Sequence, residues 1–242
     1  MICPKCGHRQ PDGGEECVHC GVIFARIKLN SGPAGDAVQA PESSPAGEAS
    51  PLEEMLFAAR PGEPQILVAG RVLLLAAILI WGVRLIAHPP ASNFSGESFL
   101  HLVNLPFHEA GHIIFSPFGR FIGVLGGSLM QLIIPLVVII AFIRTRNQFA
   151  ASVGLWWFGE SLIDLGPYIN DARAGQLMLV GGVTGSEVED YHDWENILRT
   201  VGWLHHDHAL GWAAHLLGAF LMVGALIWGG RVVWRQYRSI KR

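Results

Sequence analysis

The sequence predicts an all-α polytopic membrane protein, with about five transmembrane helices behind a small N-terminal cysteine module. Half of the residues are hydrophobic and only 15% are charged, whereas soluble domains usually carry about 25% charged residues. Long apolar runs recur after residue 64, and all four cysteines lie within the first twenty residues. The formal net charge of -3 lacks the basic excess of a nucleic-acid binder, which argues against nucleic acid as a partner.

Residues 1–29 hold the cysteine module. Cys3 and Cys6, then Cys17 and Cys20, make two Cys-x-x-Cys pairs separated by ten residues, and each pair is followed by a glycine that tolerates positive φ. Four thiolates at this spacing suit a tetrahedral Zn²⁺, and so small a module has too little core to fold without metal. The alternative, an exposed redox pair, needs a βαβ context that the sequence lacks. We therefore expect one structural zinc ion, in a module that resembles the short zinc ribbons at the head of many bacterial membrane proteins.

The rest of the chain divides into a linker and a membrane-embedded domain. Residues 30–64 are rich in Gly, Pro, Ala, Ser and Glu, a composition typical of flexible linkers. Residues 65–242 form the membrane domain. Its first apolar run, residues 66–87, is long enough to cross the hydrocarbon core, which takes about 20 helical residues. Further helices are predicted over residues 99–115, 123–143, 149–169 and 209–234.

The number of crossings decides which side the basic C-terminal tail faces. We expect the protein in a bacterial cytoplasmic membrane, with the cysteine module in the cytoplasm. Five crossings would then place the tail outside, against the positive-inside tendency. Segment 99–115 is short and polar, and the glycines of residues 123–128 could form a re-entrant turn. If segment 99–115 does not cross, Arg144, Arg146 and the tail all return to the cytoplasmic side.

Within segment 99–115, His108, Glu109 and His112 form a His-Glu-x-x-His motif. A helix turns about 100° per residue, so both histidines project from one face and can share a Zn²⁺. Glu109 lies close enough to the open coordination position to take a proton from a zinc-bound water. Charged groups near the bilayer centre cost on the order of 2.5–3.5 kcal/mol each, which favours a role over a chance match. The motif predicts a catalytic zinc and metal-assisted peptide hydrolysis.

A catalytic zinc takes a third protein ligand. Asp164 is a candidate because it lies deep in the fourth predicted helix, where an unpaired carboxylate is costly. Glu160, one turn earlier on the same face, is another. His192 lies in an acidic segment and could reach the metal only if its loop folds inward. Gln131 could hold a substrate backbone or make an ordinary interhelical hydrogen bond.

The motif resembles that of the site-2-protease-like intramembrane zinc metalloproteases. His-Glu-Ala-Gly-His fits their first motif, and their Asp ligand comes from a later membrane helix, usually in an Asn/Pro-rich turn leading into Leu-Asp-Gly. This chain lacks that string. Its nearest counterpart is Asp164 to Arg173, where Asp171 follows a Pro and precedes a small residue. The resemblance, which covers residues 99–183, therefore implies Asp171 as a ligand, level with Asp164.

Motif and resemblance together predict an intramembrane zinc metalloprotease that cuts a membrane-embedded or membrane-adjacent segment of a protein or peptide substrate. The alternative is a noncatalytic membrane adaptor, whose buried zinc holds helices together while the cysteine module recruits a cytoplasmic partner. The adaptor predicts a four-ligand site and gives Glu109 no role. Metal transport would want ionisable residues strung through more than one helix, and few residues here qualify.

Overall fold

The computed structural model describes residues 1–3, 8–24, 56–57 and 63–240. The chain divides into two compact units, Met1–Glu48 and Ala49–Arg242, and each is described by itself. Cys6 and almost all of the predicted linker, residues 30–64, lie outside the described residues.

In the first unit, two short turns frame the cysteines. Antiparallel bridges join Ile2 to Arg9 and Glu16 to Ile23. Gly21 follows the second cysteine pair with a φ of +68°, and its amide donates to the Cys17 carbonyl at 2.8 Å. A side chain would strain this left-handed backbone, so the turn favours the glycine that the sequence places there.

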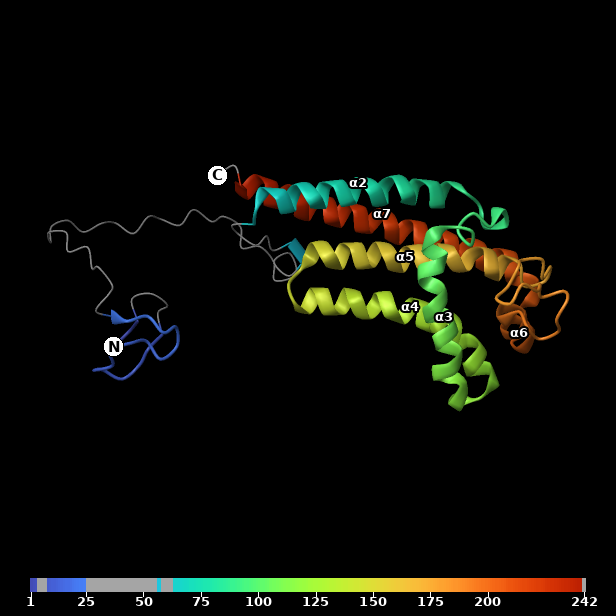
Figure 1. Ribbon diagram of the computed structural model, residues 1–242, viewed down its shortest axis with the longest axis horizontal. Coiled ribbons are helices and arrows are strands. Elements are labelled where there is room, and N and C mark those ends of the chain that lie inside the picture. The colour runs from blue at the N-terminus through green and yellow to red at the C-terminus, as the bar shows by residue number, and fades with distance from the viewer. Residues whose placement is uncertain (4–7, 25–55, 58–62, 241–242) are drawn as a thin grey trace. The chain divides into compact units, whose positions relative to one another are not determined.

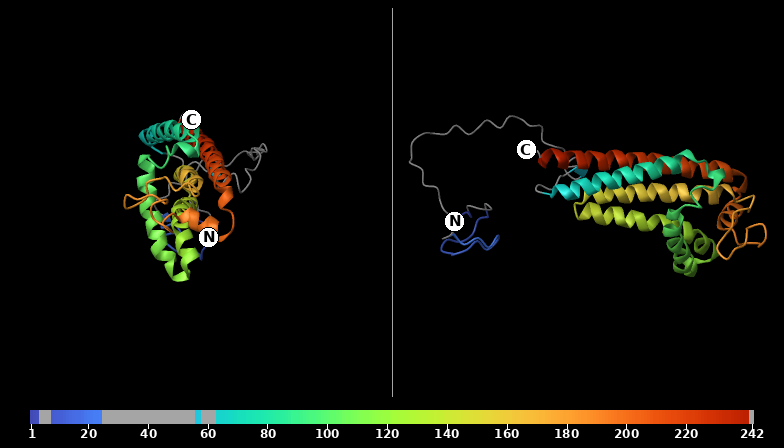
Figure 2. Two further views of the ribbon diagram at one scale, coloured as in Figure 1. Left: turned by 90° about the vertical axis from the view of Figure 1, so that its right-hand side faces the viewer. Right: turned by 45° about the horizontal axis from the view of Figure 1, so that its top comes forward.

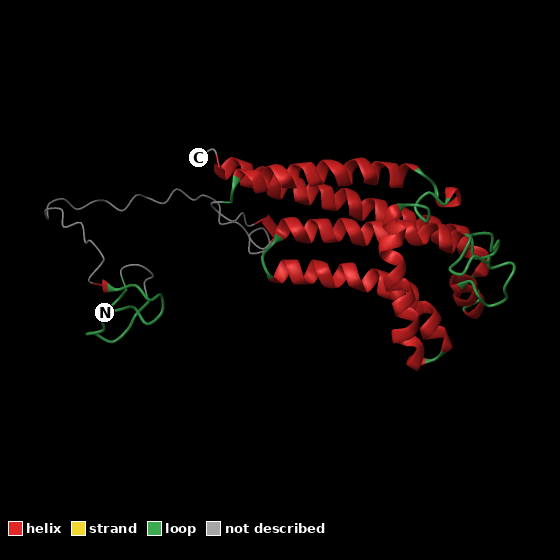
Figure 3. Cartoon of the chain, in the orientation of Figure 1, coloured by secondary structure: helices red, strands yellow, loops and turns green. Residues whose placement is uncertain are grey.

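The second unit is a bundle of long helices. Four of them, α2, α7, α5 and α4, run side by side, and α3 lies across this row (Figure 1). Figure 3 shows that its described residues form helices joined by loops, without strands. The helices are α2 (Gln65–Ala87), α3 (Phe99–Phe115), α4 (Arg120–Arg144), α5 (Gln148–Asn170), α6 (Asp193–Thr200) and α7 (Asp207–Ile240), with 3-10 turns at Pro90–Ser92, Ser116–Phe118 and Leu204–His206.

The structure has a helix at each of the five predicted positions, which confirms the all-helical class. Within the part of the chain that the structure describes, three segments are long and apolar enough to cross a membrane: Gln65–Ala87, Arg120–Arg144 and Leu204–Ile240. These are consistent with a membrane protein, while five crossings are not confirmed. The glycines of residues 123–128 lie inside α4 rather than in a re-entrant turn.

Helix α5 lies at the centre of the bundle. It packs most extensively on α7 and also contacts α4 and α2. Trp156 and Ile163 of α5 form a buried core with Leu85 of α2 and Met222 of α7. Because neighbouring helices cover it, α5 carries buried polar residues, among them Asp164, that a lipid-facing helix would not tolerate.

Helices α3 and α4 touch through glycines. A Cβ on Gly111 would lie 2.1 Å from the Gly126 carbonyl oxygen, so the two backbones are in direct contact. Ser98 caps the start of α3 by accepting a hydrogen bond from the His101 amide. The contact between Gly111 and Gly126 places one face of α3, with its two motif histidines, directly against α4.

Candidate metal centre

The three motif residues line a cavity of about 340 Å³. The metal-ligating atoms of His108, Glu109 and His112 all lie within 4.8 Å of one another, so the group could hold a metal ion. His108 is buried and Glu109 is exposed to the cavity. The structure therefore brings together the three residues that the sequence predicts on one helix.

Both imidazoles are fixed through their Nδ1 atoms. His112 Nδ1 lies 2.9 Å from the Gly123 carbonyl oxygen, and His108 Nδ1 lies 3.3 Å from Gln131 Oε1. A carbonyl oxygen can only accept, so each Nδ1 carries the hydrogen. In a neutral imidazole the lone pair then sits on Nε2, the arrangement found in metal-ligating histidines.

The carboxylate that meets the two imidazoles is Asp193, the first residue of α6. Its Oδ2 lies 2.9 Å from His108 Nε2 and 3.1 Å from His112 Nε2. Burial alone would raise the pKa of Asp193, but hydrogen bonds from the two histidines lower it to about 2. The two Nε2 atoms and one carboxylate oxygen thus converge on a single point. Such a cluster needs positive charge at its centre, either an extra proton on each imidazole or one metal ion.

Gly127 of α4 leaves room for the two imidazole rings. A Cβ built on Gly127 would lie 2.6 Å from Nε2 of both His108 and His112. Any side chain there would collide with the nitrogens that face Asp193. The glycine therefore lets α4 lie directly against the two imidazoles without displacing them.

Asp164 and Asp171, the ligands proposed from sequence, engage other partners. Asp164 accepts from Asn104 Nδ2 at 3.1 Å and Gln131 Nε2 at 2.9 Å, and His101 Nδ1 lies 3.0 Å from it. Asp171 accepts from the amides of the loop that follows α5, at residues 176 and 177. Burial raises the pKa of Asp171, but these hydrogen bonds and His192 bring it below its usual value. In the structure Asp193, rather than either of these residues, reaches the motif histidines.

Glu160 and His192 also lie in the interior with other roles. Glu160 Oε2 accepts from Asn104 at 3.0 Å, which ties it to the network around Asp164. His192 is fully buried, and its Nδ1 accepts from the Glu195 amide, which caps α6. The loop does fold inward, yet the residue that it delivers to the histidines is the neighbouring Asp193.

Sequence reasoning missed Asp193 because it sits in an acidic segment that resembles a solvated loop. A signal for it exists. Trp194, Ile197 and Leu198 repeat at the spacing of one helical face, and Ile197 and Leu198 are buried. Trp194 Nε1 also donates to Ser128 Oγ of α4 at 3.1 Å. The short helix is thereby held against the bundle, with Asp193 at its buried end.

The phenol of Tyr168, near the end of α5, forms part of the surroundings of Asp193. The Asp193 amide donates to Tyr168 Oη at 2.9 Å, and the Tyr168 ring stacks near that of His192 at 4.3 Å between centroids. Apolar residues of the loop after α5 line the cavity beside them, among them Leu177, Met178 and Leu179. The centre is thus walled by one polar cluster and one apolar loop.

A second group that could hold a metal ion lies in the cysteine module. Cys3, Cys17 and Cys20 offer sulfur atoms within 4.8 Å of one another, and Cys3 Sγ lies 3.8 Å from Cys20 Sγ. The fourth predicted ligand, Cys6, lies outside the described residues.

Comparison of the chain with models of known families, with curated proteins and with solved structures finds no match.

Proposed function

We propose that this protein is an intramembrane zinc metallopeptidase, in which His108, His112 and Asp193 hold the metal and Glu109 is the general base. The observation that carries this proposal is the convergence of both Nε2 atoms on Asp193 Oδ2 at 2.9 and 3.1 Å, beside a glutamate that lines the same cavity. Three protein ligands with the fourth position open are typical of catalytic rather than structural zinc.

The donor atoms fit zinc. Bonds of about 2.0–2.2 Å in a tetrahedral site hold ligand atoms roughly 3.3–3.5 Å apart. The nitrogen–oxygen separations of 2.9 and 3.1 Å therefore need to widen by only a few tenths of an ångström. Two imidazoles and one carboxylate are also a ligand set used by hydrolytic zinc sites.

Zinc bound here would polarise the substrate carbonyl and lower the pKa of a water to about 7. Glu109, which lines the cavity, would accept a proton from the attacking water as the oxygen of that water bonds to the substrate carbonyl carbon. The same carboxyl group then returns the proton to the leaving nitrogen as the C–N bond breaks, which yields a carboxylic acid and an amine. His108, His112 and Asp193 position the reaction, and they do not carry the transferred proton.

The cavity supports a peptide substrate with apolar side chains. Beside the charged centre it is lined by Leu105, Leu165 and the loop residues Leu177 to Val180. These walls can cover the side chains that flank a scissile bond and keep bulk water from it. A membrane-embedded or membrane-adjacent segment of another protein has this composition.

The site-2-protease-like resemblance agrees with the motif on α3 and differs in the third ligand. There the aspartate comes from a later membrane helix, whereas Asp193 begins a short helix after a loop. We infer that this chain completes the same type of centre from a different element. The adaptor alternative is less well supported, because it gives no reason for Glu109 to face a cavity beside the metal ligands.

The membrane arrangement that fits best has four crossings: α2, α4, α5 and α7. Helix α5 joins the end of α4 to the far end of the bundle, where α7 begins, so α5 must cross although its own composition is not apolar enough. Helix α3 lies across the row. The ends at which α2 begins and α7 finishes then face the same side, and the basic residues there favour the cytoplasm for that side by the positive-inside tendency. The cysteine module, with a structural zinc, follows on the cytoplasmic side, where it can recruit a protein partner.

Glu109→Gln tests the hydrolase against the adaptor. The variant should keep fold and zinc but lose the base, which typically contributes about 10²–10⁴-fold. We would express wild type, Glu109→Gln and the control Glu97→Gln, an exposed glutamate outside this cavity. Membrane-protein fragments would be compared by mass spectrometry, with zinc measured in each.

Full-length proteins that accumulate only in Glu109→Gln, with zinc retained, would support proteolysis. Fragment profiles that match in all three strains under several growth and stress conditions would favour the adaptor. Loss of zinc from Glu109→Gln would mean that Glu109 is a ligand rather than a base.

A further inference from the structure

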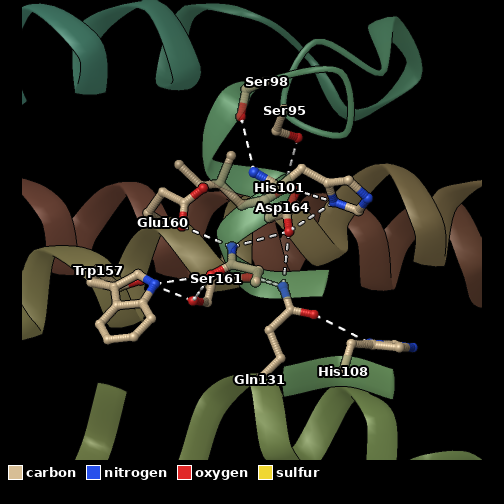
Figure 4. A network of polar contacts seen from close by, with 11 residues as sticks. Ser95, Ser98, His101, His108, Gln131, Trp157, Glu160, Ser161 and Asp164 are labelled. Atoms are coloured by element: carbon tan, nitrogen blue, oxygen red, sulfur yellow. Dashed lines mark hydrogen bonds and ion pairs between the residues drawn. The ribbon is translucent and has the colours of Figure 1, made fainter. Parts of the chain in front are cut away.

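The polar network behind His108 runs through one buried amide. Gln131 lies in the middle of α4 and is 4% exposed. Its Oε1 lies 3.3 Å from His108 Nδ1, and its Nε2 lies 2.9 Å from Asp164 Oδ2 and 3.5 Å from the Ser161 carbonyl oxygen. Figure 4 shows Gln131 between His108 on one side and Asp164 and Ser161 on the other.

The direction of this amide is determined by its partners on α5. A carbonyl oxygen can accept a hydrogen bond but cannot donate one, and the same is true of an ionised carboxylate. Asp164 already gathers donors, since Asn104 Nδ2 lies 3.1 Å and His101 Nδ1 3.0 Å from its oxygens. If the amide were flipped, its oxygen would face two acceptors in a buried setting and its NH₂ group would lose both of them, which is unfavourable. The NH₂ group of Gln131 therefore faces α5, and its oxygen faces His108.

The direction of the amide in turn determines the tautomer of His108. Gln131 Oε1 has no hydrogen to donate, so the hydrogen between the two side chains belongs to His108 Nδ1. The lone pair of the neutral ring then lies on Nε2, which faces Asp193 at 2.9 Å. With the opposite tautomer, an N–H would point into the metal position and the ring could not ligate.

We propose that Gln131 is a positioning residue that fixes the metal-binding tautomer of His108, and that buried Asp164 fixes Gln131. This inference rests on the proposed metal centre. Asp164 was a candidate metal ligand from the sequence. In this proposal Asp164 does not bind the metal but acts on it through Gln131 and His108. Groups that hydrogen-bond to metal-ligating histidines typically contribute 10–100-fold to metal affinity.

A purely structural role for Gln131, as one hydrogen bond between α4 and α5, predicts something different. Loss of that hydrogen bond would lower the stability of the bundle and leave the metal affinity of the folded protein unchanged. The two roles separate when zinc affinity is measured on protein that has been shown to be folded.

The experiment compares three variants of the full chain in detergent. Gln131→Met removes the acceptor at similar volume. Gln131→Glu in its protonated form keeps a carbonyl oxygen that accepts from His108 and an O–H that donates to Asp164. Gln236→Met is the control, because Gln236 is also 4% exposed but belongs to α7. Zinc dissociation constants come from competition with a chelator, and the cysteine module serves as an internal reference that should not change.

We expect Gln131→Met to bind zinc 10–100-fold more weakly, Gln131→Glu to stay within about threefold of wild type, and Gln236→Met to match wild type. Unchanged affinity in folded Gln131→Met would overturn the positioning role. So would equal losses in the Met and Glu variants, because the Glu variant retains the acceptor.

A measurement on the unaltered side chains covers the case in which Gln131→Met does not fold. Nitrogen-15 NMR of labelled histidine should show His108 protonated at Nδ1 and metal-bound through Nε2, its signals being identified by their loss in His108→Gln. Zinc bound through Nδ1, or a neutral ring protonated at Nε2, would refute the proposal. The protease proposal can be refuted independently of this inference. A protein that binds zinc with this tautomer but cleaves no substrate would refute the protease proposal and leave the role of Gln131 intact.

Discussion

At the scale of single residues, the proposed metal centre depends on a missing side chain as well as on its proposed ligands. Gly127 faces His108 and His112 so closely that its Cβ would lie 2.6 Å from both Nε2 atoms. A methyl group at Gly127 would therefore push both imidazoles away from the positions in which they face Asp193.

Gly127→Ala should abolish zinc binding at this centre while α4 stays helical. Alanine favours a helix interior over glycine by about 0.5–1 kcal/mol, so loss of metal would not reflect a weaker helix. Gly70→Ala in α2 is the control, because a Cβ there meets nothing within 4 Å. Zinc content and circular dichroism of both variants check this, and full zinc occupancy in Gly127→Ala would remove Gly127 from the centre.

The sequence predicted the residues of one turn of helix and missed those contributed from far away. His108, Glu109 and His112 lie within five positions, so helical periodicity alone places them together. Asp193 lies 85 positions from His108, and no local pattern reports such a distance. Burial did mark Asp164 as a residue with partners, and its partners proved to be Asn104, Gln131 and His101.

At the scale of helices, the bundle is held by glycines on facing positions of α5 and α7. A Cβ on Gly218 would lie 2.4 Å from the Gly159 carbonyl oxygen, and one on Gly211 would lie 2.8 Å from the Gly166 carbonyl oxygen. Backbones can approach this closely only where both helices carry small residues. This contact leaves α5, which carries Asp164 and Tyr168, facing α3 and the cavity.

Gly218→Ala should destabilise the bundle, because the carbonyl it would meet belongs to backbone and cannot rotate away. Overpacking of this kind costs about 1–3 kcal/mol. Gly224→Ala in the same helix meets nothing within 4 Å and should be neutral or slightly stabilising. Thermal unfolding in detergent measures the difference, and equal melting temperatures for the two variants would show that the α5–α7 contact is looser than described.

The apolar runs located the long helices to within three residues, except that α7 continues six residues past its predicted end at 234. The number of crossings does not follow from these runs. Segment 99–115 is helical as predicted, yet Figure 1 shows that α3 lies across its neighbours. Orientation relative to other helices depends on packing, here on Gly111 against Gly126. Helix α6 escaped prediction because eight residues in an acidic stretch carry too short a periodic signal.

At the scale of the whole membrane domain, charge separates its two ends. Val68 of α2, Phe149 of α5 and Val232 of α7 form one buried cluster, so the start of α2, the start of α5 and the end of α7 lie together. Figure 2 shows the same grouping from a second direction. The arginines near this end are Arg71, Arg144, Arg146, Arg231, Arg235 and Arg238. The cavity and the acidic segment around Asp190 lie at the other end, where Arg120, Arg173 and Arg199 each pair with an acidic residue.

This separation predicts that the cavity opens on the side of the membrane opposite the cytoplasm. In a chain whose native cysteines are replaced by serine, a cysteine at Glu187 should react with a membrane-impermeant maleimide in intact bacterial cells. A cysteine at Arg146 should react only after the membrane is opened. Labelling of the Arg146 position in intact cells, with the Glu187 position protected, would invert the topology. Labelling of both positions from outside would mean that α5 does not cross the membrane.

The central claim, that His108, His112 and Asp193 hold a zinc ion, is tested most directly by the zinc content of Asp193→Ala. Wild type should carry two equivalents, one in each unit, and Asp193→Ala should retain only that of the cysteine module. Asp190→Ala is the matched control, because Asp190 lines the same cavity three residues away. We expect it to keep both. Two equivalents of undiminished affinity in Asp193→Ala would contradict the claim, and loss of one in Asp171→Asn instead would identify the ligand that the family resemblance implies.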